Sequence, residues 1–136
     1  MNDRIVFKGD VLLCEDDAMN RELILGRLSK IGITPVTAEN GKEGVELVEQ
    51  RIKNGSKPFD LILMDIIMPV MDGIEATVEI LKMNTGTPII AMTGNYTPSD
   101  KKKYLACGMS DCLCKPFTLQ ELKNCVSKYM GEGVYE

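Results

Sequence analysis

The chain has 136 residues, 44% of them apolar and 26% charged, which fits one soluble domain with a substantial core better than two domains. Its formal net charge of −4 argues against nucleic acid as a partner of this domain, because phosphate binding needs clustered Lys and Arg. No apolar run approaches the roughly 20 residues that span a bilayer, and the first residues lack the apolar stretch of a secretory signal, so we expect no membrane contact.

The chain contains five Cys and no His. An odd number of Cys without paired spacing predicts reduced thiols, hence a cytosolic or nuclear compartment, and we expect the protein to be cytoplasmic. The absence of His excludes Ser-His-Asp and Cys-His catalysis, a His-ligated metal and a phosphohistidine within this chain.

Short apolar runs alternate with longer amphipathic segments along the chain. In chain order, we expect a strand over 11–14, a helix from 19 to a stop at Gly32, a strand over 33–37, a helix over about 45–52, a strand over 59–64, a helix over 74–83, a strand over 88–92, a helix from 98 or 99 to 106, a strand over 110–114 and a helix from a cap at Thr118 to about Met130.

This alternation predicts right-handed βαβ units, and therefore an α/β fold with a single doubly wound five-stranded parallel sheet and five helices on its two faces. We expect one domain over 10–130. The segments 1–9 and 131–136 are expected to be loose.

In an open parallel sheet, ligands bind outside the carboxyl ends of the strands. The residues expected there are Glu15, Asp16 and Asp17 after the first strand, Asp65 after the third, Thr93 after the fourth and Lys115 after the fifth. Clustered carboxylates repel one another unless a cation offsets their charge, and oxygen ligands favour Mg²⁺ or Mn²⁺ over zinc.

Each residue has a simpler explanation when it is taken alone. The acidic run can cap the first helix, Thr93 can be an ordinary strand-end hydroxyl, and Lys115 can be a surface lysine. Asp65 ends a buried run, however, and a buried carboxylate needs a partner. A metal ion, a hydroxyl and an ammonium around one carboxylate form a pocket for three phosphoryl oxygens, so we expect Asp65 to be a nucleophile in phosphoryl transfer.

Four segments carry a resemblance to a known family. Residues 63–73, Leu-Met-Asp-Ile-Ile-Met-Pro-Val-Met-Asp-Gly, closely resemble the phosphoacceptor segment of response regulator receiver domains in two-component signalling. Residues 13–17, followed by Asn20-Arg21, resemble the acidic pair of that family in the Glu-Asp form common in hybrid histidine kinases. Residues 91–95 resemble its switch hydroxyl motif, and residues 115–117 resemble its invariant-lysine motif. The resemblance covers about residues 10–130.

The resemblance implies a flavodoxin-like fold with strand order 2-1-3-4-5 and a role for each matching residue. Mg²⁺, or Mn²⁺ in its place, would be held by Glu15 through water, by Asp16 and Asp65 directly, and by the backbone carbonyl of Ile67. Asp65 would receive the phosphoryl group beside Thr93 and Lys115. Asp17 would cap the first helix, and the bond before Pro116 would be cis. The donor would be a histidine kinase or a histidine phosphotransfer protein.

The sequence departs from the family at one position that bears on switching, and two further positions bear on the lifetime of the phosphoryl group. Cys112 stands where the family has an aromatic switch residue, which leaves Tyr96 and Tyr104 as candidate replacements, and we expect less complete switching. Ile67 is apolar and Asn95 is neutral, so we expect slow hydrolysis of the acyl phosphate. The face formed by the fourth helix, fifth strand and fifth helix is also where a homodimer contact is expected.

Four other kinds of function fit the sequence less well. A phosphorylation-independent pseudo-receiver is disfavoured by the intact residue set. A phosphatase of the haloacid-dehalogenase type would need an acid where Ile67 stands. A nucleotide site would need a glycine-rich loop after the first strand, which is missing. A metal-thiolate site would draw on Cys107, Cys112, Cys114 and Cys125, whose spacing is not that of paired CxxC knuckles.

Overall fold

The computed structural model describes residues 5–94 and 97–135. The strands are β1 (Ile5–Val6), β2 (Val11–Cys14), β3 (Val36–Ala38), β4 (Leu61–Asp65), β5 (Ile89–Thr93), β6 (Asp111–Cys114) and β7 (Val134–Tyr135). The helices are α1 (Ala18–Lys30), α2 (Gly41–Lys53), α3 (Gly73–Leu81), α4 (Pro98–Ala106) and α5 (Leu119–Met130). The predictions for Asn95 and Tyr96 lie outside the described residues.

Five of the strands form one parallel sheet in the order β3-β2-β4-β5-β6. Counted without the short terminal strand β1, this is the predicted order 2-1-3-4-5, and the predicted α/β class is confirmed. The order reverses direction between β2 and β4, since β3 lies on one side of β2 and β4 to β6 lie on the other. A crevice is expected at such a switch point, outside the carboxyl ends of the strands.

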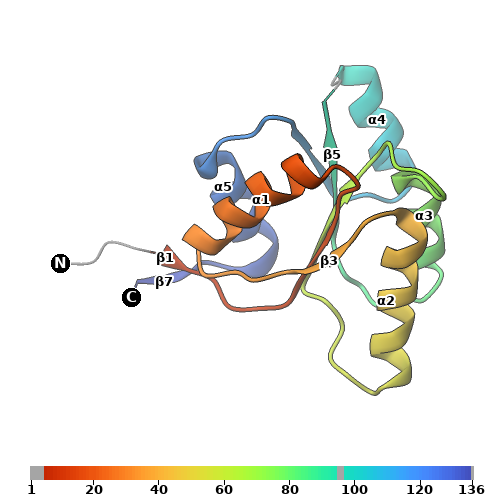
Figure 1. The fold of residues 1–136 in the computed structure, drawn as a ribbon, viewed down its shortest axis with the longest axis horizontal. Coiled ribbons are helices and arrows are strands. Elements are labelled where there is room, and N and C mark those ends of the chain that lie inside the picture. Colours follow the sequence, from red (N-terminus) through yellow and green to blue (C-terminus); the bar gives the residue numbers. More distant parts are fainter. Residues whose placement is uncertain (1–4, 95–96, 136) are drawn as a thin grey trace.

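The helices cover both faces of the sheet (Figure 1). On one face, α1 and α5 enclose a core that includes Leu13, Leu28 and Leu63. On the other face, α2, α3 and α4 pack over a second core that includes Ile62 and Tyr104. Strands β2, β4 and β5 are buried along their whole length, which explains their nearly continuous apolar sequences.

A polar residue caps the amino end of each helix. In every helix, the cap's side chain accepts a hydrogen bond from the backbone N–H three residues later, and the caps are Asp17, Asn40, Asp72, Thr97 and Thr118. These bonds satisfy N–H groups that have no partner within the helix. The predicted caps at Asp17 and Thr118 are confirmed, and so is the cis bond before Pro116.

The two ends of the chain differ from the expectation of loose segments over 1–9 and 131–136. In the described part, β1 and β7 pair as a small antiparallel sheet beside α1 and α5 (Figure 1). Phe7, which follows β1, is buried in the core, and its N–H donates to the carbonyl of Ile31 at 2.9 Å. Two-residue strands carry too little pattern to be recognised in a sequence.

Some element boundaries also shift. The second predicted strand, over 33–37, is only Val36–Ala38 in the structure, although Ile33 is buried in the core. Asp65 and Thr93 belong to their strands as last residues, because each stays in register with the neighbouring strand. In the described residues, no helix has the length and apolar character needed to cross a membrane.

Candidate functional site

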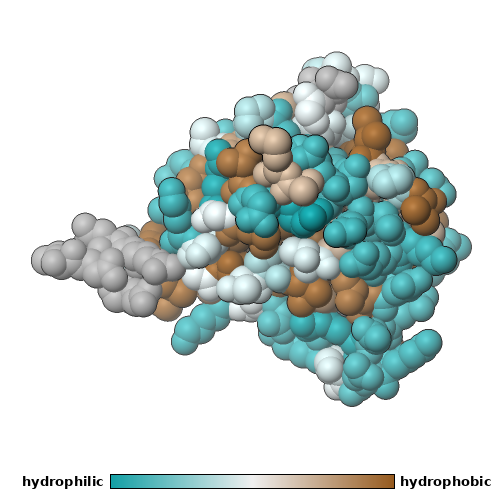
Figure 2. All heavy atoms as spheres, viewed as in Figure 1, coloured by the Kyte–Doolittle hydropathy of each residue, from teal (hydrophilic) through white to brown (hydrophobic). Residues whose placement is uncertain are grey.

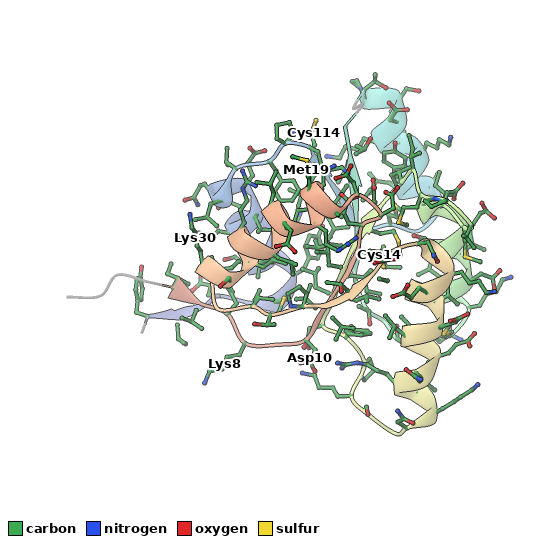
Figure 3. The ribbon with its side chains drawn as sticks, viewed as in Figure 1. Lys8, Asp10, Cys14, Met19, Lys30 and Cys114 are labelled. Carbon is green, nitrogen blue, oxygen red and sulfur yellow. The ribbon has the colours of Figure 1, made fainter. Side chains whose placement is uncertain are left out.

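The predicted site residues converge at the carboxyl edge of the sheet. Hydrogen bonds between neighbouring strand ends hold them there: the N–H of Glu15 donates to Ala38 at 3.0 Å, and the N–H of Lys115 donates to the carbonyl of Thr93 at 2.7 Å. Cys14, the last residue of β2, lies at this edge of the sheet, and Asp10, just before β2, lies at the opposite edge (Figure 3). Parallel strands therefore bring together side chains that are up to 100 positions apart in sequence.

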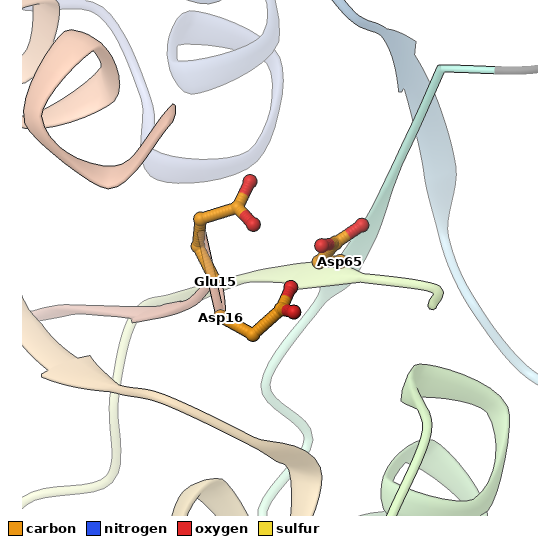
Figure 4. A group of neighbouring side chains, drawn as sticks. All are labelled: Glu15, Asp16 and Asp65. Carbon is orange, nitrogen blue, oxygen red and sulfur yellow. The ribbon is translucent and has the colours of Figure 1, made fainter. Parts of the chain in front are cut away.

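Three carboxylates share one small space at this edge. Glu15 and Asp16 come from the loop after β2, and Asp65 comes from the last position of β4 (Figure 4). One oxygen from each lies within 4.8 Å of the others. Glu15 and Asp65 are buried, whereas Asp16 is exposed. Asp17 follows them and serves as the cap of α1 instead.

Lys115 provides the positive charge that this group needs. Its Nζ donates to Oε1 of Glu15 at 2.8 Å and lies 3.2 Å from Oδ1 of Asp65. Burial alone would lower the pKa of Lys115, but the hydrogen bond to Glu15 and the charge of Asp65 raise it above its ordinary value. The ammonium therefore stays charged and bridges the two buried carboxylates.

One ammonium does not balance three carboxylates. Burial and the nearby Glu15 raise the pKa of Asp65 to about 7, although Lys115 acts in the opposite direction. A second cation would offset the negative charge that Lys115 leaves unbalanced. Three carboxylate oxygens at this spacing are hard ligands suited to Mg²⁺, which binds through one or two carboxylates and keeps several waters, so the residues fit the predicted ion.

A cleft of about 400 Å³ opens beside Asp65. Its lining includes Thr93 and Lys115 as predicted, together with Gly94 and Phe117. Thr93 is the last residue of β5 and is buried. The other wall comes from α1, which brings Asn20 and Arg27 to the cleft. Sequence reasoning missed this wall, because helix spacing alone does not say which side of a helix borders a site.

Two further residues shape the site without having been predicted to do so. Arg21 donates from Nη1 to the carbonyl oxygen of Glu15 at 2.9 Å. Gly73 packs so closely under Asp65 that a Cβ atom there would lie 2.1 Å from the Asp65 carbonyl oxygen. Asp72-Gly73 reads in the sequence as an ordinary turn, and only the matching phosphoacceptor segment pointed to its place.

The metal-thiolate alternative, which the Cys spacing already disfavours, gains no support from the described residues. Among the described residues, the metal-ligand types that lie close enough together to hold an ion are Glu15, Asp16 and Asp65. All five Cys are free thiols in the structure. Burial raises the pKa of Cys112 to about 11 and that of Cys125 to about 12, so both remain protonated at neutral pH.

Comparison with known proteins identifies the same family that the site motifs resemble. The family model for the response regulator receiver domain matches residues 11–127. The chain belongs to this family. The receiver domain is 42% identical over 122 residues to two-component system protein A of Emericella nidulans, covering 89% of this chain but 17% of that relative. It spans about a fifth of the length of the curated relatives first matched.

Two solved structures are close to this receiver domain. The receiver domain of a sensor histidine kinase from Pseudomonas aeruginosa, with magnesium in its active site cleft, has a TM-score of 0.80 and 34% identity, covering 90% of this chain and 98% of that one. The receiver domain of Ssk1 from Saccharomyces cerevisiae, in complex with the histidine phosphotransfer protein Ypd1, has a TM-score of 0.81 and 30% identity, covering 93% and 91%. The chain is thus a receiver domain of two-component signalling.

Proposed function

We propose that this receiver domain, residues 10–130, takes a phosphoryl group from a phosphohistidine onto Asp65 with Mg²⁺. The observation that carries the proposal is the position of Lys115, whose ammonium contacts both Glu15 and Asp65 at the mouth of the cleft. An aspartyl phosphate would meet this ammonium without a large movement. Phosphoryl transfer depends mainly on positioning and charge neutralisation, and this site supplies both.

The bonding changes follow from this geometry. An ionised oxygen of Asp65 attacks phosphorus, the bond between phosphorus and the donor imidazole nitrogen breaks, and the imidazole takes up a proton from solvent. Lys115 and the hydroxyl of Thr93 offer donors to the phosphoryl oxygens. Glu15, Asp16, Asp65 and the backbone carbonyl of Ile67 would hold Mg²⁺ or Mn²⁺. When bound, the ion supplies positive charge that favours ionised Asp65 and offsets the incoming phosphoryl group.

The phosphodonor in this proposal is a histidine kinase or a histidine phosphotransfer protein. Two exposed apolar side chains, Leu23 and Ile67, line the cleft, and two more, Met19 and Val70, are exposed on the same segments, α1 and the loop after β4. Met19 projects from the start of α1, and apolar atoms lie among polar ones over this helix (Figures 2 and 3). The Ssk1 receiver, which shares this fold, was crystallised with such a phosphotransfer protein. We further propose that the domain acts in the cytoplasm, where it contacts neither nucleic acid nor membrane.

The output face is α4, β6 and α5. Cys112 packs against the core that contains the buried Tyr104 of α4, so a smaller side chain stands at the position of the family's switch aromatic. We propose that phosphorylation shifts this face less completely than in relatives with the aromatic, and that any homodimer forms through it. Amide chemical shifts in β6, recorded with a phosphoryl analogue, test the switch. A full two-state change along the whole face would contradict the proposed incomplete shift.

We also propose that the aspartyl phosphate is long-lived. Ile67 is apolar and 77% exposed, so its side chain offers no hydrogen bond to orient an attacking water. Decay of a radiolabelled phosphoryl group on the purified domain measures the lifetime. A half-life of minutes or longer is expected, and one of a few seconds would contradict this part of the proposal.

The decisive test uses a radiolabelled histidine phosphotransfer protein as donor and the wild-type chain as acceptor, with Mg²⁺. We expect one label per chain, no transfer to Asp65→Asn and little transfer after chelation of the metal. A pseudo-receiver would take no label at all. A phosphatase would instead release inorganic phosphate from a generic phosphate ester over many turnovers, and the receiver would not.

A further inference from the structure

We propose that Arg21 is a positioning residue that holds the acidic loop in the shape required for cation binding. Arg21 lies in the first turns of α1, and its side chain is only 18% exposed. Nη1 donates to the carbonyl oxygen of Glu15 at 2.9 Å, while Nη2 lies 3.7 Å from Oε1 of Glu39, beyond the end of β3. The inference rests on the proposed function, because it concerns the same metal site.

The bond acts on the peptide unit between the two acids of the pair. The carbonyl of Glu15 and the N–H of Asp16 belong to one rigid plane, so fixing the carbonyl also fixes the direction in which Asp16 leaves the loop. Glu15 is held further by Lys115 at Oε1, by the N–H of Asp17 at Oε2 and by its own N–H at Ala38.

Asp16 lacks such support of its own. Its side chain is exposed, and within the described part of the chain no hydrogen bond or ion pair holds its carboxylate. Its placement within 4.8 Å of the oxygens of Glu15 and Asp65 therefore depends on the backbone before it. Arg21 is the side chain that fixes this backbone. Removal of a group that orients a metal ligand commonly weakens metal binding by about 10–100-fold.

The sign of the effect separates this role from two simpler ones. A guanidinium that acted only as a nearby positive charge would repel the cation, so removing it would tighten cation binding. A guanidinium that only stabilised the fold would leave the cation affinity unchanged. A positioning residue is the case in which loss of the positive charge weakens cation binding.

The experiment titrates the metal-free chain with Mn²⁺ and follows the electron paramagnetic resonance signal of the unbound ion. We expect Arg21→Met to weaken Mn²⁺ binding about tenfold. Arg21→Lys keeps the charge but not the planar fork, and should lie between Arg21→Met and wild type. In the absence of metal, the Asp17 amide, which donates to Glu15, should exchange its hydrogen faster in both variants.

Arg51→Met is the matched control. Arg51 makes the same kinds of bond, to the carbonyl of Lys57 at 2.9 Å and to the carboxylate of Asp10 at 3.0 Å, but at the amino end of the sheet. The Mn²⁺ affinity of the Arg51→Met chain should equal that of wild type even if its stability falls.

Unchanged or tighter Mn²⁺ binding by the Arg21 variants would overturn the inference. If Arg21→Met does not fold, an affinity of Arg21→Lys equal to wild type overturns it. Failure of wild type itself to bind Mn²⁺ would instead refute the proposed function, and this inference with it.

Discussion

Asp65 is held where its environment disfavours its charge. It is 6% exposed and lies beside Glu15, and these two causes raise its pKa to about 7 against the opposing effect of Lys115. A carboxyl group with this pKa is protonated in part of the population at neutral pH when no metal is bound. Cation binding and ionisation of Asp65 are therefore coupled, and Mg²⁺ affinity should rise as the pH increases through about 7.

The same shift predicts how stability depends on pH. Because the folded pKa lies above the ordinary value of 3.8, the folded chain binds more protons at Asp65 than the unfolded chain between about pH 4 and 7. Protonated Asp65 therefore contributes to the free energy of unfolding in full below about pH 4, and this contribution is lost as the pH rises to about 7. Without metal, Asp65→Asn should be more stable than wild type at about pH 8, by a margin that shrinks towards pH 4.

Urea unfolding at several pH values measures this difference. Asp17→Asn is the control, because Asn caps a helix as well as Asp, and we expect it to give no gain that grows with pH. A gain for Asp65→Asn that is the same at every pH would show that the charge of Asp65 is not the cause.

Lys115 should matter for folding as well as for phosphoryl transfer. Replacing it with Met leaves Glu15, which is fully buried, without its positive partner, and breaking a buried ion pair costs about 3 kcal/mol or more. The free energy of unfolding of Lys115→Met should fall by about this amount, and the second substitution Glu15→Gln should restore part of it. A double variant no more stable than Lys115→Met would contradict the pairing.

The connection between β4 and α3 contains a strained residue. Val70 has a positive φ of 68°, a conformation that β-branched residues rarely adopt, and its side chain is 76% exposed. This loop also carries Ile67 and closes with a bond from the N–H of Gly73 to the carbonyl of Ile66 at 2.8 Å. The strained residue thus lies in the loop that follows Asp65, which we expect to contact the metal.

Relieving this strain should stabilise the domain. Asn tolerates a positive φ better than Val does, so Val70→Asn should raise the free energy of unfolding by about 1 kcal/mol. The reverse change serves as its control: Asn84 has a φ of 54°, and Asn84→Val should lower stability by a similar amount. Denaturant unfolding measures both, and equal stabilities for all three chains would count against a strained loop.

At the scale of the whole molecule, the chain ends are part of the fold. Phe7 is 4% exposed and packs into the core beneath α1 and α5, while β1 and β7 pair outside it. Phe7→Ala should therefore cost about 3 kcal/mol, as core Phe deletions usually do. Val134→Ala, at a position 56% exposed, should cost much less. If both have equally small effects on the urea midpoint, the terminal segment contributes nothing to the core.

The sequence predicted the α/β class and the residues at the strand ends because both depend on strong local patterns, whereas the sheet order came from the resemblance to receiver domains. Buried parallel strands are nearly continuous in apolar residues, and the residue that ends each such run must lie at the sheet edge. The strand ends thus pointed to Asp65, Thr93 and Lys115 as candidate site residues, and the structure places all three around one cleft. The Mg²⁺ ligand set remains a prediction, and the role of the Ile67 carbonyl belongs to it.

What the sequence did not predict depends on tertiary contacts. Arg21 was recognisable only as part of a motif, because its bond to Glu15 requires the particular approach of α1 to the loop after β2. Strands β1 and β7 are two residues each, and their pairing joins segments from opposite ends of the chain. The raised pKa of Asp65 likewise follows from burial and proximity, which periodicity does not measure.

The intact mass of the chain after incubation with acetyl phosphate is the most direct test of whether Asp65 accepts a phosphoryl group. With Mg²⁺ present, wild type should gain the mass of one phosphoryl group, whereas Asp65→Asn, and wild type without the metal, should gain none. A phosphoryl group added equally to Asp65→Asn, or to wild type after the metal is removed, would contradict the assignment of Asp65 as a metal-dependent phosphoacceptor.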